Sequence, residues 1–311
     1  WPVFYMLGGD DHILELSHKT FDGVTAQFSR CDSGHGHPMV VKEYEQGYDW
    51  MHQGEGYVFF YNLCLADPGN EKNSERARRF AGFYLNEDPD IINYDPEKKI
   101  LLSPHLGSMG PAYRNWEEGK RGYPYSFWKV YPLPFLDIEG IDTVEDLQKP
   151  GMEEKMAQAM ADRMARGDVA VNLASTSLVM NAYMFGGESK EKYKRWILEY
   201  VDAWIQRTHN NKGILPDNVG HSGQVGELMG GRWYGGNYGW TWPHGWGTLG
   251  DAVTCAAENA LALTGDRAYL DLPRSQIDLL VSHGELKGET WHIPECHNDH
   301  GWFQYHPMRV D

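Results

Sequence analysis

The sequence predicts an all-α fold in which helices pair into hairpins around a common axis. Three observations support this prediction. A short turn of glycine and an acidic residue recurs along the chain. The helical segment before each turn is apolar on nearly all sides, whereas the segment after it is amphipathic. Long loops then separate each hairpin from the next, so the chain repeats one supersecondary unit.

The turn motif is clearest in residues 7–16 and 263–272, which share Leu, Gly, Asp, Leu and Leu at equivalent positions. Looser copies occur at residues 185–189 and 66–70. Glycine ends the first helix in a left-handed conformation, and the acidic or polar residue begins the next helix near its positive end. We therefore interpret Asp10-Asp11 as a turn and helix cap rather than as a catalytic pair.

The helices fall into two kinds. Residues 57–65, 168–184 and 248–263 are apolar nearly all round and are predicted to be buried. In residues 189–209, aromatic and aliphatic side chains recur at the spacing of one helical face, and charged residues occupy the other face. The methionine stripe between Met152 and Met164 is interpreted as core packing.

The long loops, residues 29–47, 89–150, 210–241 and 285–311, all connect an amphipathic helix to the next buried one. They are therefore expected on one face, where loops presented by a rigid scaffold carry function. We predict an (α/α) toroid with a single domain over residues 1–311, in which residues 89–150 elaborate the loop face. The chain opens on Trp1-Pro2 as if within an element, so we expect that the full-length protein extends beyond it.

The turns at residues 8–10, 186–188 and 264–266, with the alternating helix character, resemble the six-hairpin glycosidase-like (α/α) toroids. This superfamily includes glycoside hydrolases and polysaccharide lyases. The resemblance is one of architecture and covers most of the chain, although about four hairpins are found where those folds have about six. It implies an enzyme that acts on carbohydrate.

The composition limits the classes of partner that the protein is expected to bind. A formal net charge of −16 argues against nucleic acid or an anionic membrane surface. No apolar run of about 18 residues is present, so no membrane-spanning helix is expected. The 12 Trp and 18 Tyr residues suit a protein that handles carbohydrate, and we expect a secreted or periplasmic location.

Residues 217–247 combine glycine, tryptophan, tyrosine and histidine with Glu227 near their centre. Glycine lets the backbone approach a ligand closely, and aromatic rings offer flat faces to a sugar. The alternative, a loop that only fills the core, stays open. Two similar segments, Trp50-Met51-His52 and Trp242-Pro243-His244, begin buried helices, so His52 and His244 are expected to face one pocket. The predicted substrate-binding residues are Trp50, His52, His221, Arg232, Trp233, Asn237, Trp240, Trp242 and Trp246.

Glycoside hydrolysis requires two carboxyl groups, one to protonate the leaving oxygen and one to act as base or nucleophile. The acids on the loop face are Glu43, Glu45, Asp49, Glu55, Glu227, Glu295 and Asp299. We predict that Glu227, flanked by apolar Leu228 and Met229, pairs with Asp49 or Glu55.

Two alternatives remain. A polysaccharide lyase would use Tyr238 or His244 as its base, with Arg232 or Arg114 on a uronate carboxylate. A carbohydrate-binding protein without catalysis would use the same aromatic loop.

No cofactor is predicted, because the phosphate-binding, dinucleotide and nucleophile-elbow motifs are absent from the sequence. Cys31 and Cys296 lie in histidine-rich loops, where a disulfide or a structural Zn²⁺ or Ca²⁺ ion is an alternative. Cys64 and Cys255 are expected to be buried thiols.

Overall fold

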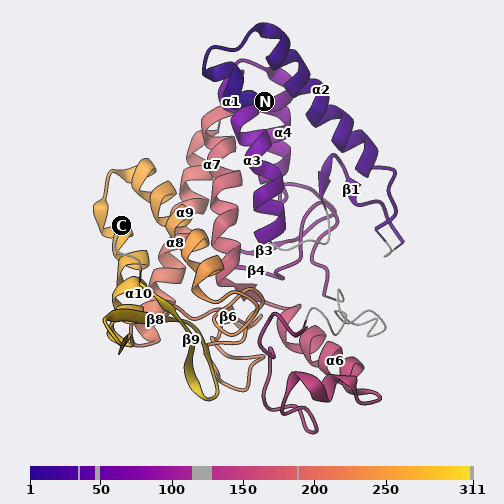
Figure 1. The fold of residues 1–311 in the computed structure, drawn as a ribbon. Helices are drawn as coiled ribbons and strands as arrows, with labels where there is room; N and C mark the ends of the chain where they lie inside the picture. The colour runs from indigo at the N-terminus through magenta and orange to yellow at the C-terminus, as the bar shows by residue number, and fades with distance from the viewer. Residues whose placement is uncertain (34–35, 46–49, 114–127, 188, 309–311) are drawn as a thin grey trace.

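The computed structural model describes residues 1–33, 36–45, 50–113, 128–187 and 189–308, and for residues 50–56 it describes the backbone only. Helical hairpins make up the upper part of the molecule in Figure 1. The helices of these hairpins are α1 (Pro2–Met6), α2 (Asp11–Phe28), α3 (Trp50–Ala66), α4 (Glu71–Gly82), α7 (Thr176–Phe185), α8 (Lys190–Asn210), α9 (Trp246–Thr264) and α10 (Asp271–Ser282).

The predicted short turns connect α1 to α2, α3 to α4, α7 to α8 and, through the 3₁₀ helix η3 (Arg267–Leu270), α9 to α10. The Asp10 carboxylate accepts a hydrogen bond from the Ile13 backbone N–H at the start of α2. Gly265 ends α9 in the left-handed region, with φ of 75°. The interpretation of residues 7–10 and 263–266 as hairpin turns, with Asp10 as a helix cap, is therefore confirmed.

The main core forms where α4 and α8 pack against α7, and α7 in turn lies beside α3 and α9. The predicted apolar face of α8 is buried here, including Tyr193, Tyr200 and Trp204. A second apolar cluster surrounds α6 (Met152–Met164), in the lower part of Figure 1, where Met156, Met160 and Met164 are buried. This burial confirms the interpretation of the methionine stripe as core packing.

The predicted all-α toroid is wrong. Within the described residues the helices form four consecutive hairpins rather than a six-hairpin ring, and the long loops contain antiparallel sheets, which makes the fold mixed α and β. The two-stranded sheets are β1 (Val40–Val41) with β2 (Tyr44–Glu45), β3 (Tyr94–Asp95) with β4 (Ile100–Leu101), and β5 (Asp168–Val169) with β6 (Asn218–Val219).

The largest of these sheets joins β7 (Glu285–Lys287), β8 (Thr290–Asn298) and β9 (Gly301–Pro307), below α10 in Figure 1. Its sequence is rich in aromatic and β-branched residues, which favour strands. Asn298 pairs with Gly301, so two residues close the β8–β9 hairpin. The histidines of this segment, interpreted as a loop that could bind a metal, belong mostly to paired strands.

Two fully buried carboxylates connect the loops beneath the helices. Asp217 accepts hydrogen bonds from the backbone N–H groups of Gly235, Gly236 and Trp240, at 3.1, 2.8 and 2.7 Å. A Cβ atom on Gly239 would lie 2.1 Å from the Asp217 carboxylate, so this close approach requires glycine. Burial raises the pKa of Asp217 to about 6.

Asp168, on β5, accepts hydrogen bonds from the Leu101 backbone N–H at 3.1 Å and from the Tyr200 hydroxyl at 2.9 Å. Burial also raises the pKa of this carboxylate to about 6. Asp168 therefore links β4, β5 and α8. The loops that contain these strands are packed and hydrogen-bonded, although their sequence shows no regular pattern.

All four cysteines are described as free thiols, so the disulfide between Cys31 and Cys296 does not form here. Cys64 and Cys296 are buried, but Cys255 is exposed, which corrects its predicted burial. Among the described helices, no segment is long and apolar enough to cross a membrane.

Candidate functional site

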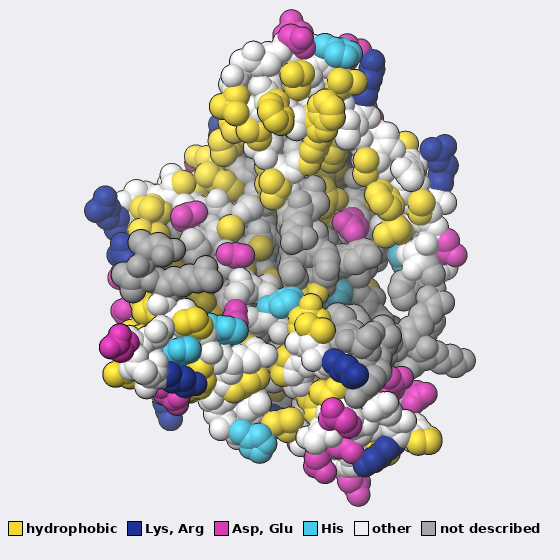
Figure 2. All heavy atoms as spheres, in the orientation of Figure 1, with side chains coloured by type: hydrophobic (Ala, Val, Ile, Leu, Met, Phe, Trp, Pro, Cys, Tyr) yellow, Lys and Arg dark blue, Asp and Glu magenta, His cyan; other side chains and the backbone are white. Residues whose placement is uncertain are grey.

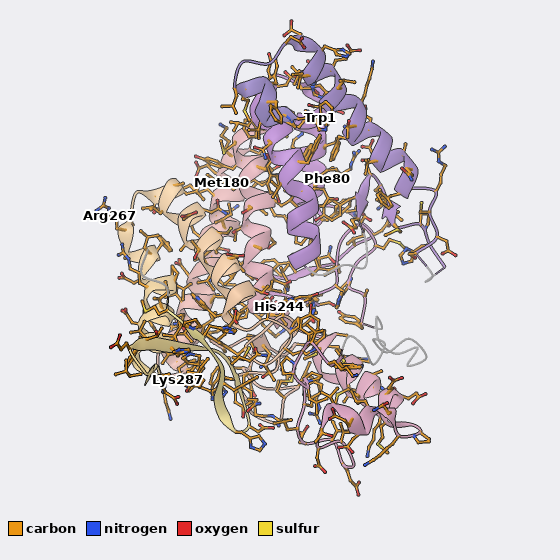
Figure 3. The ribbon with its side chains drawn as sticks, in the orientation of Figure 1. Trp1, Phe80, Met180, His244, Arg267 and Lys287 are labelled. Carbon is orange, nitrogen blue, oxygen red and sulfur yellow. The ribbon has the colours of Figure 1, made fainter. Side chains whose placement is uncertain are left out.

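A cavity of about 1000 Å³ lies where α3, α7 and α9 meet strand β8. Its polar lining includes Ser177, His244, Asp251, Cys255 and Glu295. In Figure 2 apolar side chains gather over the upper helices, and histidines and acids lie across the middle of the same face. Figure 3 places His244 at the centre of the molecule, where the helices meet the loops. The volume is sufficient for a small organic ligand.

The start of α9 is shaped by two glycines. A Cβ atom on Gly247 would lie 2.8 Å from Oε1 of Glu295, and one on Gly250 would lie 2.9 Å from the indole of Trp246. Glycine at these positions therefore leaves space for a carboxylate and for an aromatic ring along the same helix. Gly245 precedes the helix with φ of 55°, and its Cβ would lie 2.2 Å from the Glu295 carbonyl oxygen. Strand β8 consequently passes directly against the first turn of α9.

Glu295 is a cavity carboxylate with two distinct oxygens. Its Oε1 lies beside Gly247, and its Oε2 lies 3.0 Å from Nε2 of His306 on β9. The positive end of a helix favours a negative charge at this place. Asp251 follows Gly247 by four residues and also lines the cavity. Residues four apart on a helix have Cβ atoms about 5–6 Å apart, so Asp251 follows the Gly247 position, beside which Glu295 Oε1 lies, by about one helical turn.

Trp246 supplies the aromatic surface of the cavity. One face of its indole stacks on Trp240, with ring centroids 5.9 Å apart and an interplanar angle of 17°. The ring is half-buried and lines the cavity, and its predicted role in substrate binding stays a prediction. A flat ring fixed in this way can pack against the apolar face of a sugar.

His244 also lines the cavity, and its ring lies 5.0 Å from Tyr131 and 6.1 Å from Tyr238. Tyr238 is buried, with 6% of its surface exposed. The described contacts therefore bring the predicted pair Tyr238 and His244 close together, but they bring only His244 to the cavity wall.

Glu227 lies elsewhere. Its side chain is exposed, and its carboxylate accepts hydrogen bonds from the backbone N–H and the hydroxyl of Ser222, at 2.9 and 2.5 Å. These contacts hold the turn that precedes it. The expected apolar enclosure by its neighbours is therefore absent around this residue, because Glu227 points back onto its own turn.

The remaining predicted residues of the glycine-rich stretch have structural contacts. His221 Nε2 lies 2.8 Å from the Leu102 carbonyl oxygen, and Arg232 forms ion pairs with Asp137 and Asp299. Trp233 packs against His297 and Trp302, and Asn237, Trp240 and Trp242 are fully buried. A ligand could reach the buried rings only if neighbouring side chains moved.

Asp49 lies outside the described residues, and so do the side chains of Trp50, His52 and Glu55. Helix α3 begins at Trp50, close to the predicted position, but the expected convergence of His52 with His244 stays a prediction. Among the described residues, no group of three His, Cys, Asp or Glu side chains is arranged to hold a metal ion.

Sequence reasoning missed Asp251 and did not choose Glu295 among the acids of the loop face. The available signal was the pair of glycines in the first turns of an otherwise apolar helix, Gly247 and Gly250. Cys255 adds an exposed thiol to the same wall. Partial desolvation by the surrounding atoms raises the pKa of Cys255, against the opposing effect of a hydrogen bond with Ser177, so the protonated form is favoured.

Fold and cavity together define a protein of helical hairpins with several small antiparallel sheets in the connecting loops and a ligand-sized cavity at the start of α9. The model of a protein family described as a domain of unknown function, DUF8034, matches residues 1–294, and the chain belongs to this family. No curated protein and no solved structure matches the chain.

Proposed function

We propose that the chain is a carbohydrate-active hydrolase whose site is the cavity at the start of α9. The observation that carries this proposal is the convergence of Glu295, Asp251 and the fixed ring of Trp246 on one cavity. Paired carboxyl groups flanking a glycosidic bond stand about 5–9.5 Å apart in glycoside hydrolases. Glu295 Oε1 lies beside Gly247, and Asp251 stands one helical turn further along α9, so both carboxyl groups border the same cavity.

In this proposal Glu295 and Asp251 replace Glu227 and its partners as the acid and base. Trp246 would hold the sugar ring, and His244 would contact its hydroxyl groups. The described cavity wall carries acids and no Lys or Arg side chain. This composition gives less support to the lyase alternative, which needs a cation to neutralise a uronate carboxylate.

The test replaces each proposed catalytic carboxylate by its amide, as Glu295→Gln and Asp251→Asn. A panel of neutral and uronate-containing oligosaccharides is screened for new reducing ends and for ultraviolet absorbance from an unsaturated product. We expect hydrolysis by the unaltered protein and a loss of about 10²- to 10⁴-fold in each variant, the range for removing an acid or base.

Two matched controls use exposed acids outside the cavity wall: Glu289→Gln in the β7–β8 turn and Asp278→Asn on α10. Both should retain full activity. Activity retained in Glu295→Gln and Asp251→Asn would reject this site, and an unsaturated product would favour the lyase. Sugar binding without any cleavage would favour the non-catalytic alternative.

A further inference from the structure

The two oxygens of Glu295 have different surroundings. Oε1 faces the start of α9, next to Gly247, whereas Oε2 lies 3.0 Å from Nε2 of His306. The Glu295 side chain is 34% exposed and the His306 side chain is 60% exposed, so this contact lies near the surface. One oxygen is thus held and the other is left toward the cavity.

The pairing of β8 with β9 explains why a residue of β9 reaches Glu295. Pro294 pairs with Tyr305 and Cys296 with Phe303, which leaves Glu295 opposite Gln304. Gln304 has φ of 55°, and its Oε1 accepts a hydrogen bond from the Cys296 thiol at 2.9 Å. Gln304, the direct neighbour of Glu295, is therefore hydrogen-bonded to Cys296. His306, the diagonal neighbour, contacts Glu295 instead. Diagonal neighbours on one face of a sheet lie within reach of long side chains.

We propose that His306 is a positioning residue that holds Glu295 Oε2 and so directs Oε1 into the cavity. This inference rests on the proposed function, in which the Glu295 carboxylate reacts. The arrangement follows the general logic in which a third group orients the acid or base of a catalytic pair. His306 itself does not line the described cavity wall, so it acts through Glu295 rather than on a ligand.

A pair of conservative variants tests the role of the Nε2 atom. In His306→Gln the side-chain amide can place an N–H donor near the original Nε2, whereas in His306→Asn the donor ends short of Glu295. We expect His306→Gln to retain most of kcat and His306→Asn to lower kcat by about 10- to 100-fold, the scale of a small misplacement of a reacting group. KM should change little in both, because the cavity wall is intact.

The exposed position of His306 makes both variants expected to fold, which thermal unfolding checks. Equal activity in the two variants, whether high or low, would overturn the proposal, because a purely structural or irrelevant role does not distinguish Gln from Asn. Crystal structures provide a readout independent of activity. The Glu295 side chain should keep its conformation in His306→Gln and change it in His306→Asn.

If the unaltered protein cleaves no sugar, the proposed function fails, but the crystal structures still decide the positioning role. An unchanged Glu295 conformation in His306→Asn would reject that role even if hydrolysis is found.

Discussion

Asp217 is the first residue of the glycine-rich stretch, and Glu295 of strand β8 lies against its other end. The surroundings of these two carboxylates differ sharply. Asp217 is fully enclosed and accepts three backbone N–H groups of the loop that follows. Glu295 contacts the end of the stretch at Gly245 and Gly247, is one-third exposed and faces a cavity. A carboxylate whose hydrogen-bond partners all come from the protein serves the fold. One that keeps an oxygen toward open space is available to a ligand.

The largest expected effect of this difference is on stability. Asp217→Ala leaves three buried N–H groups without their acceptor, and each such group costs about 1–3 kcal/mol. We expect the free energy of unfolding to fall by at least about 3 kcal/mol in urea titrations followed by circular dichroism. Asp251→Ala, an exposed carboxylate on α9, is the control and should change it by about 0.5 kcal/mol or less. Similar losses in the two variants would break the comparison.

Asp168 is the second buried carboxylate, and the dependence of the free energy of unfolding on pH tests its environment. Burial raises the pKa of Asp168 from 3.8 to about 6, so the folded state binds the proton more tightly than the unfolded state between these values. Stability from this group is therefore present below about pH 4 and is lost as the pH rises to about 6.

Asp168→Asn cannot titrate at this position. The free energy of unfolding of the unaltered protein, relative to Asp168→Asn, should decrease by about 2–3 kcal/mol between about pH 4 and pH 7. Urea titrations at several pH values measure this difference. A difference that stays constant, or that increases with pH, would contradict the assignment of a raised pKa.

The smallest effect concerns the cavity carboxylate. Glu295→Gln removes the charge of a partly exposed carboxylate that lies 3.0 Å from the His306 imidazole, and even charged pairs at such positions contribute only about 0–1 kcal/mol. We therefore expect its free energy of unfolding to change by about 1 kcal/mol or less, while the hydrolysis proposed for the cavity is lost. Destabilisation as large as that in Asp217→Ala would identify Glu295 as part of the framework instead.

The hairpin part of the fold could be predicted because its signals are local. Gly265, the Asp10 cap and the apolar face of α8 each depend on residues within a few positions along the chain. The sheets could not be predicted in the same way. Strands of two residues, such as β5 and β6, carry almost no pattern, and their pairing joins Asp168 to Val219 across a long separation in sequence.

The candidate site shows the same limit. His244 and Trp246 lie at the start of a clearly apolar helix, which is a local signal, and both line the cavity; their roles in binding or catalysis stay predictions. The place of Glu227 among glycines led to its prediction as a catalytic acid. Its carboxylate instead accepts a hydrogen bond from Ser222, five residues earlier. Glu295 reaches the cavity only because β8 passes against Gly245 and Gly247, a contact that no local pattern contains.

The network around Asp168 and Asp217 has a consequence for the kinetics of ligand binding. It ties strands β4, β5 and β6, helix α8 and the loop up to Trp240 into one unit, and Trp240 in turn supports the ring of Trp246. The Trp246 ring in the cavity wall thus rests on packed structure, and a ligand that enters need not first order this ring. Little conformational entropy would then oppose binding against Trp246, and association would proceed without a slow rearrangement of these loops.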